Sequence, residues 1–476
     1  FRDGQELLKN KEENKMARKT YADMRSNWEF GEAAECRRGL MRGMGYSEEE
    51  LHRPLIAVVN SWNEYNPGHV HLGQLAERVK QGIREAGGLP LEVMTTAICD
   101  GMVLKDPKYI EIPSRNSIAD QVEITVEGNF FDGMVMLSTC DSIVPGHLMA
   151  AARLDIPTII VTGGYMPHGQ FRGQEVLHIR AQDKVGTAAA GKMDMDEYNG
   201  LIANSWGICG ACTSMTTANS MCMVAEAMGM TLPGNSTMSA VSSQIRLLSY
   251  EAGRQIMNLV YEGITARQIM TVDAIKNAIA MDMAVAASSN LILHIPAIAH
   301  EAGYDLPWWK YFDEASNSVP LLSHLAPGGE YSVKDFDLAG GMPALLKNLM
   351  PRLNGDCLTV TGNTLKENVK NAVVYNNDVI RTLDNPVSSE PGIGVLYGNL
   401  APEGSILKIA AVPKNLMHYQ GKAKCFDSLQ AGLNALRAGE IHEGDAIVLR
   451  YLGLKGRFGT TAFTFQEELK GKKELY

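Results

Sequence analysis

Long apolar runs are scarce in this chain of 476 residues. The longest, such as residues 156–161, match a buried strand and fall far short of the roughly 20 residues that a membrane-spanning helix needs. Residues 1–15 are polar and charged, without the apolar segment of a signal peptide. We therefore expect a cytoplasmic protein with no membrane partner.

The chain is also poor in cysteine and has no excess of positive charge. The chain holds 8 cysteines, and its 44 Lys and Arg residues are outnumbered by 54 Asp and Glu residues. So few cysteines do not make a disulfide scaffold, which fits a reducing compartment. The formal net charge of −10 disfavours a nucleic-acid partner. A small anionic substrate stays compatible, because a local Arg or Lys can override the global charge.

Short apolar segments alternate with helical segments in the first third of the chain. The predicted strands are residues 55–59, 91–94, 133–137 and 158–161. The predicted helices between them are residues 72–86, 117–127 and 147–153. Continuous apolar strands that alternate with helices predict an α/β fold with a parallel sheet. Ligand sites of such sheets lie at the carboxyl ends of the strands.

The predicted secondary structure changes along the chain. Residues 180–350 are mostly helical in pattern. After residue 355, where Gly, Pro and Asp are frequent, short β-like runs are predicted at 358–360, 393–396, 406–409 and 446–449. A chain of this length exceeds one ordinary core. We predict a charged helical arm at 1–30, an α/β cluster- and metal-binding domain at 31–350, and a smaller β-rich, barrel-like domain at 351–476, which we expect to be incomplete.

Three cysteines lie in short loop signatures marked by Gly, Asp or Pro. Cys99 lies in Ile-Cys-Asp-Gly, Cys140 in Thr-Cys-Asp-Ser-Ile-Val-Pro-Gly, and Cys212 in Gly-Ala-Cys-Thr-Ser. Three thiolates that converge on one point suit an iron–sulfur cluster with one iron left open. Asp100 and Asp141 directly follow two of these cysteines and offer the oxygen ligands that Mg²⁺ prefers. A soft cluster beside a hard cation predicts a Lewis-acid dehydration site.

Other readings of these residues stay open. A free cysteine is often only a small buried hydrophobic residue, and the other five cysteines are read this way. Cys209 and Cys212 form a single C-x-x-C, which without a second one does not predict a structural zinc site. Arg115 suits bidentate binding of a substrate carboxylate, and its alternative role is a solvated arginine at a helix start.

Taken together, these segments resemble the family of dihydroxy-acid and sugar-acid dehydratases, over nearly the whole chain. The most specific matches follow one another in order at residues 66–72, 99–101, 113–120, 140–146, 217–219, 293–303, 355–362 and 398–404. Pro-Gly-His at 67–69 and Cys-Asp-Gly at 99–101 place the chain closest to one branch of this family.

The resemblance implies that Cys99, Cys140 and Cys212 hold the cluster, with [4Fe–4S] favoured over [2Fe–2S]. It implies that Asp100 and Asp141 ligate Mg²⁺. The implied reaction dehydrates a 2,3-dihydroxy carboxylate, with an aldonic sugar acid favoured over a branched-chain dihydroxy acid, to a 2-keto acid. It further implies a homodimer or homotetramer that acts on a small anionic substrate.

Three segments depart from the family pattern. Ser142 replaces a carbamylated Lys that ligates Mg²⁺ in the family, so Mg²⁺ binding should weaken. Residues 105–108 (Lys-Asp-Pro-Lys) replace a His-Glu-Gly-Met loop. The family's base, a Ser near the C-terminus, is not identifiable. Either residues 456–459 are its segment without the Ser, or residues 473–476 match an earlier segment, which we favour. In that case Glu474 ligates Mg²⁺ and the base lies beyond this chain.

The predicted substrate-binding residues are Ser114, Arg115 and Ser142. The departures motivate two alternatives. The first is a non-catalytic homologue that acts as a binding or assembly protein. The second is a related lyase or isomerase that uses the same cluster on another substrate.

Overall fold

A four-stranded parallel sheet lies in the N-terminal part of the chain. The computed structural model describes residues 18–103, 109–452, 465–466, 468–469 and 472. The strands are β1 (Leu55–Asn60), β2 (Leu89–Met94), β3 (Gly133–Ser138) and β4 (Thr158–Thr162), in the order β2-β1-β3-β4. All residues of β1, β3 and β4 are buried, as their apolar sequences require of strands covered on both faces. The predicted α/β fold with a parallel sheet is confirmed.

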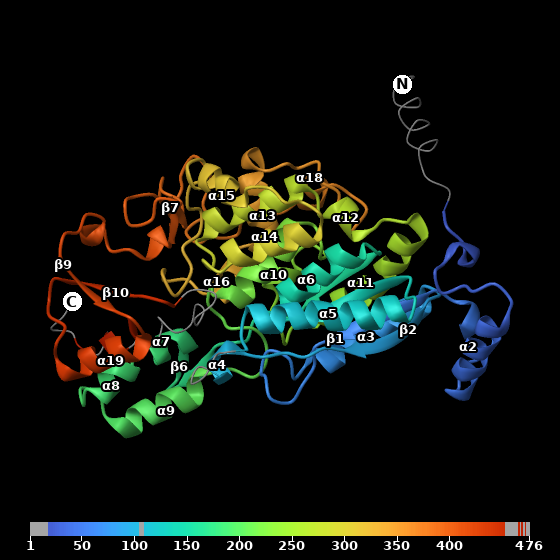
Figure 1. The fold of residues 1–476 in the computed structure, drawn as a ribbon, viewed down its shortest axis with the longest axis horizontal. Coiled ribbons are helices and arrows are strands. Elements are labelled where there is room, and N and C mark those ends of the chain that lie inside the picture. Colours follow the sequence, from blue (N-terminus) through green and yellow to red (C-terminus); the bar gives the residue numbers. More distant parts are fainter. Residues whose placement is uncertain (1–17, 104–108, 453–464, 467, 470–471, 473–476) are drawn as a thin grey trace, which may run out of the picture.

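Helices cover both faces of this sheet. α3 (Leu72–Glu85) connects β1 to β2, whereas α5 (Ile112–Gly128) and α6 (Ile143–Leu154) belong to connections that run in the opposite direction. Because parallel crossovers are right-handed, opposite directions place these helices on opposite faces. α11 (Ser243–Glu262) packs beside α3, and α5 packs beside α6. In Figure 1, α3 and α5 are coloured blue to cyan, whereas α11, which comes later in the chain, is yellow-green.

Two glycines allow α3 and α11 to cross closely. A Cβ atom added at Gly82 would overlap the carbonyl oxygen of Tyr250, and one added at Gly253 would overlap that of Val79. We expect Gly253→Ala to lower the free energy of unfolding by roughly 2 kcal/mol or more, because the helices would have to separate. The measurement is denaturant unfolding.

The matched control for this prediction is Gly39, inside α2 (Glu32–Gly43). A Cβ atom there meets nothing within 4 Å. Gly39→Ala should therefore stabilise the protein by up to about 1 kcal/mol, through helix propensity alone. Equal effects of the two substitutions would contradict the proposed close crossing.

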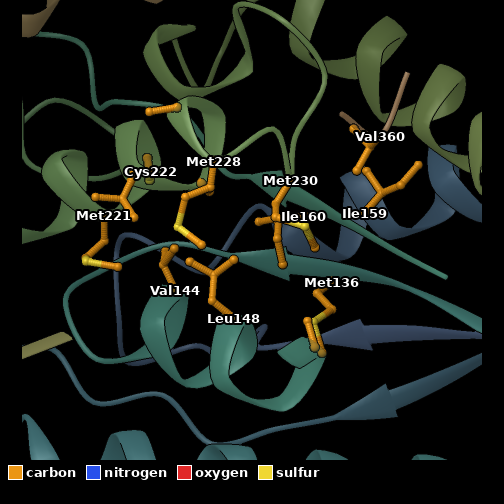
Figure 2. Packing of buried hydrophobic residues seen from close by; sticks show 14 of the residues in the cluster. Met136, Val144, Leu148, Ile159, Ile160, Met221, Cys222, Met228, Met230 and Val360 are labelled. Carbon is orange, nitrogen blue, oxygen red and sulfur yellow. The ribbon is translucent and has the colours of Figure 1, made fainter. Parts of the chain in front are cut away.

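A methionine-rich core joins the sheet to a layer of further helices. Met136 on β3 and Ile160 on β4 face Leu148 on α6, and Met228 and Met230 close the cluster from the far side (Figure 2). The backbone N–H of Ile160 also donates to the carbonyl oxygen of Met230 at 2.8 Å, which ties the two layers together. The flexible thioether side chains suit the irregular space between strands and helices.

The middle of the chain is helical, as predicted. The helices there and before it are α4 (Asp100–Val103), α7 (His178–Gln182), α8 (Val185–Ala189), α9 (Met195–Ser205), α10 (Thr217–Ala227), α12 (Ala266–Ile269), α13 (Val272–Val285), α14 (Leu291–Glu301), α15 (Trp308–Ser316), α16 (Val333–Leu338), α17 (Gly341–Leu349) and α18 (Leu365–Val369). A small antiparallel pair, β5 (Gly169–Phe171) and β6 (Gln174–Val176), lies before α7.

The C-terminal part carries short strands. β7 (Gly394–Leu396) pairs with β8 (Ser405–Leu407), and β9 (Lys422–Phe426) pairs with β10 (Asp445–Leu449), with α19 (Leu429–Ala438) between the latter two. Three predicted strand segments thus appear, at 393–396, 406–409 and 446–449. The predicted strand at 358–360 is wrong, because Leu358 forms only an isolated bridge with Thr364.

The N-terminal segment differs in detail from the predicted arm. Residues 1–17 lie outside the described residues. Residues 18–30 contain one 3-10 turn, Tyr21–Asp23, and the first α-helix is α2. Instead of forming a helix, this segment is tied to the sheet through Ser26, whose hydroxyl donates to Asp132 at 2.5 Å. In the described part of the chain, no helix is both long and apolar enough to span a membrane.

Candidate active site

Two of the three predicted cysteines follow strands of the sheet, and the third precedes a helix. Cys99 lies between β2 and α4, Cys140 lies two residues after β3, and Cys212 lies five residues before α10. The carboxyl ends of parallel strands lie along one edge of the sheet, and only β1 separates β2 from β3, which explains how the first two come together. Cys140 has a φ of 69°, a left-handed conformation that is rare for a residue other than glycine.

The sulfur of Cys140 is closely packed against Gly68 and Asn66. A Cβ atom added at Gly68 would lie 2.6 Å from this sulfur, so the Pro-Gly-His loop needs its glycine here. The thiol lies 3.7 Å from Oδ1 of the buried Asn66, to which it donates. The side chain of Cys140 is buried, whereas Cys99 and Cys212 are partly exposed.

The three thiols interact with one another. A hydrogen bond with Cys140 lowers the pKa of Cys99. That interaction, followed by burial and the nearby charges, raises the pKa of Cys140 well above its usual value. Burial also raises the pKa of Cys212, and the charges of Asp100, Asp141 and Cys99 add to this effect. The structure thus brings the three predicted cysteines into one electrostatic cluster, and none of them forms a disulfide.

Two carboxylates lie beside the thiols. Burial raises the pKa of Asp100, and the charge of Glu111 adds to it. Burial raises the pKa of Asp141 well above its usual range, with further contributions from Asp100 and Glu111. Negative groups crowded together in a buried site favour a bound cation.

Glu111 is a site residue that the sequence analysis missed. Its side chain is 1% exposed, and Oε1 accepts a hydrogen bond from Nδ2 of Asn290 at 3.1 Å. Oε2 lies 3.1 Å from Nε2 of His294 without hydrogen-bond geometry. The backbone of Glu111 has a φ of 61°. The only signal in the sequence is a charged residue set between two isoleucines, Ile110 and Ile112.

The predicted substrate-binding residues make hydrogen bonds within the protein, and two of them bind the backbone of Glu111. Oγ of Ser142 accepts a hydrogen bond from the backbone N–H of Glu111 at 3.0 Å, and Oγ of Ser114 donates to its carbonyl oxygen at 3.3 Å. Nη1 of Arg115 donates to the carbonyl oxygen of Leu293 at 3.3 Å and to Nδ1 of His294 at 3.2 Å. Arg115 is therefore a buried arginine, not a solvated one, with an internal set of partners.

Among the described residues, no three His, Cys, Asp or Glu side chains already have the geometry that holds a metal ion. Glu474 and the segments 105–108 and 456–459 lie outside the described residues. The chemistry of the donor set, three soft thiols beside hard carboxylates, still fits a cluster and a divalent cation.

A cavity of about 350 Å³ adjoins the cluster. Asp100 and Cys212 contribute to its wall, together with Trp206, Asn290 and Lys408. Its size falls in the range of small-molecule sites, and its lining combines apolar surface with a few polar groups. A small molecule can be accommodated there.

A buried hydrogen-bond network joins α6 to the carboxyl ends of β2 and β3. His147 is fully buried, with Nδ1 2.6 Å from Oγ of Ser138 and Nε2 3.1 Å from Oγ1 of Thr95. Burial lowers the pKa of His147 to about 3. The stability that comes from keeping this ring neutral is complete above its unfolded pKa of about 6.5, and is lost as the pH falls below that value.

We expect the unfolding free energy to fall by about 1.4 kcal/mol per pH unit for this histidine below pH 6. Comparing denaturant unfolding of the parent and of His147→Gln between pH 7 and pH 4 isolates its contribution. The variant should show the shallower pH dependence. Parallel curves would mean that His147 does not titrate on unfolding.

Family models match almost the whole chain. Residues 53–368 match the N-terminal domain of dihydroxy-acid/6-phosphogluconate dehydratases, and residues 378–474 match their C-terminal domain. A dihydroxy-acid dehydratase of Caldanaerobacter subterraneus is 46% identical over 88% of this chain and 76% of its own length. One from Methanococcoides burtonii is 43% identical over 91% of this chain and 79% of its own length. The chain belongs to the dihydroxy-acid/6-phosphogluconate dehydratase family and is a dehydratase, a carbon–oxygen hydro-lyase.

Proposed function

We propose that this dehydratase converts a 2,3-dihydroxy carboxylate, a branched-chain dihydroxy acid or an aldonic sugar acid, to a 2-keto acid. The observation that carries the proposal is the gathering of three thiols and two carboxylates beside one cavity. The name of the curated relatives, dihydroxy-acid dehydratase, supports the substrate class.

We assign the cofactors by the chemistry of the donors. Cys99, Cys140 and Cys212 would hold an iron–sulfur cluster, with [4Fe–4S] favoured. Asp100 and Asp141 would hold Mg²⁺, joined by Glu474 from outside the described residues. When bound, these groups would supply Lewis-acid activation of the leaving hydroxyl and of the substrate oxygens near C2.

The remaining chemistry needs a base and an enclosed site. A base must take the proton from C2, and the hydroxyl that leaves C3 must gain a proton to depart as water. The resulting enol then tautomerises to the 2-keto acid. The base is unassigned in this chain, because the serine that serves in the family has no counterpart among the described residues. Partial enclosure of the cavity limits competing water and strengthens electrostatic interactions within it.

Ser114, Arg115 and Ser142 have a proposed positioning role. Their hydrogen bonds fix the backbone of Glu111 and the ring of His294 beside the carboxylates. Direct contact of these three side chains with the substrate stays a prediction. Ser142 cannot supply the anionic oxygen of a carbamylated lysine, so the site depends more strongly on its remaining carboxylates.

The proposal is tested with full-length protein purified without oxygen. Iron, acid-labile sulfide and bound Mg²⁺ are measured per chain, and branched-chain dihydroxy acids and aldonic acids are assayed for 2-keto-acid formation. Cluster-loaded protein that forms a 2-keto acid from either class supports the proposal. Gel filtration of the same protein tests the proposed homodimer or homotetramer.

Two outcomes would favour the alternatives. Loss of substrate without 2-keto acid would indicate a related lyase or isomerase. Protein that takes up neither iron nor sulfide after reconstitution, and turns over no substrate, would indicate a binding or assembly role.

A further inference from the structure

Lys408 brings a positive charge into the cavity from the C-terminal part of the chain. It directly follows β8 and shares the cavity wall with Asp100 and Cys212. The backbone next to it is anchored, because the N–H of Ala410 donates to the carbonyl oxygen of Gly392 at 3.2 Å. Of the side chains that line this cavity, Lys408 is the only Lys or Arg in the described part of the chain.

The ammonium group of Lys408 is not committed to another partner. Among the described residues, Nζ makes no hydrogen bond and no ion pair within 4.0 Å. Asp282 is the carboxylate whose charge acts on Lys408, but it is buried and its Oδ1 has no hydrogen-bond partner. Burial raises the pKa of Asp282 well above its usual range, which weakens it as a counter-ion.

Burial also lowers the pKa of Lys408, to about 8, so the ammonium form still prevails at neutral pH. An ammonium group held in a partly buried wall without a partner favours binding of an anion. Arg115, the cation that the sequence favoured, does not line this cavity and already donates to Leu293 and His294.

We propose that Lys408 binds the carboxylate of the substrate within this cavity and selects acids over neutral polyols. The inference rests on the proposed function and adds the residue that recognises the acid group. One carboxylate oxygen would accept from Nζ of Lys408, while the hydroxyl-bearing carbons lie toward Asp100 and Cys212. The chain can therefore capture an anion despite its net charge of −10.

The test compares Lys408→Met and Lys408→Arg with the parent protein, and uses Lys414→Met as the matched control. Lys414 lies on the same segment but is exposed and outside the cavity wall. Each protein is checked for iron content and thermal unfolding. Its affinity for a 2,3-dihydroxy acid and for the corresponding amide is then measured by calorimetry, alongside KM and kcat.

Lys408→Met should weaken binding of the acid and raise KM about 10- to 100-fold, the value of a hydrogen bond to a charged group. Affinity for the neutral amide should stay unchanged. Lys408→Arg should recover part of the acid affinity, and Lys414→Met should match the parent. Unchanged discrimination between acid and amide in folded, iron-loaded Lys408→Met overturns the inference. A parent protein that binds the acid but forms no keto acid overturns the proposed reaction and leaves this inference standing.

Discussion

Replacing Cys140 with serine is expected to remove the iron–sulfur cluster and to lower turnover by at least about 10³-fold, because a Lewis acid supplies several kcal/mol in such reactions. The sulfur of Cys140 is fixed in place between Gly68 and Asn66. A serine hydroxyl is a hard, poorly ionised donor and does not replace a thiolate. Iron and acid-labile sulfide per chain, measured without oxygen, report the loss directly.

Cys222 and Cys209 offer two matched controls. Cys222 is buried in α10, within the core that joins the sheet to the helices, and Cys222→Ala should cost only stability. Cys209→Ser tests the C-x-x-C interpretation, and it should retain iron if Cys212 acts with Cys99 and Cys140. Full iron content in Cys140→Ser, or its loss in Cys209→Ser, would contradict the assignment.

Much of the fold could be predicted because its causes are local. The apolar strands at 55–59 and 133–137 had to be buried on both faces, and the helical spacing between strands required parallel crossovers. The cysteine loops could be located for the same reason, since parallel strands deliver their carboxyl ends to one edge. The polar, alternating sequence of β9 gave no such signal, and its parallel pairing with β10 depends on a partner 23 residues further on.

The remainder of the site depends on contacts between distant segments. Glu111 and Lys408 belong to short segments with no motif of their own, and only the tertiary structure brings them near Asp100. Arg115 shows the reverse case. From the sequence, Arg115 was expected to bind the carboxylate of the substrate. In the structure, its guanidinium group instead donates hydrogen bonds to Leu293 and His294.

The second large effect is expected from Asp141→Asn. Asp141 is 5% exposed and lies within a group of negatively charged neighbours, which makes its own charge unfavourable without a cation. Removing that charge should raise the Tm of the metal-free protein by a few degrees, because like-charge crowding is relieved. The same change should abolish the increase in Tm that Mg²⁺ gives to the parent, since an amide oxygen is a far weaker ligand than a carboxylate.

Asp132→Asn is the matched control, because Asp132 is also a buried aspartate but lies away from the cavity wall. Its carboxylate accepts hydrogen bonds from the backbone N–H and hydroxyl of Ser26 and from the backbone N–H of Leu55. Asn can accept only through one oxygen, so this variant should lower the Tm while keeping the full response to Mg²⁺. Opposite signs for the two substitutions separate a carboxylate that awaits a cation from one that the fold itself satisfies. If Asp141→Asn kept the Mg²⁺ response, the cation would have to be held by the other proposed ligands, Asp100 and Glu474, without it.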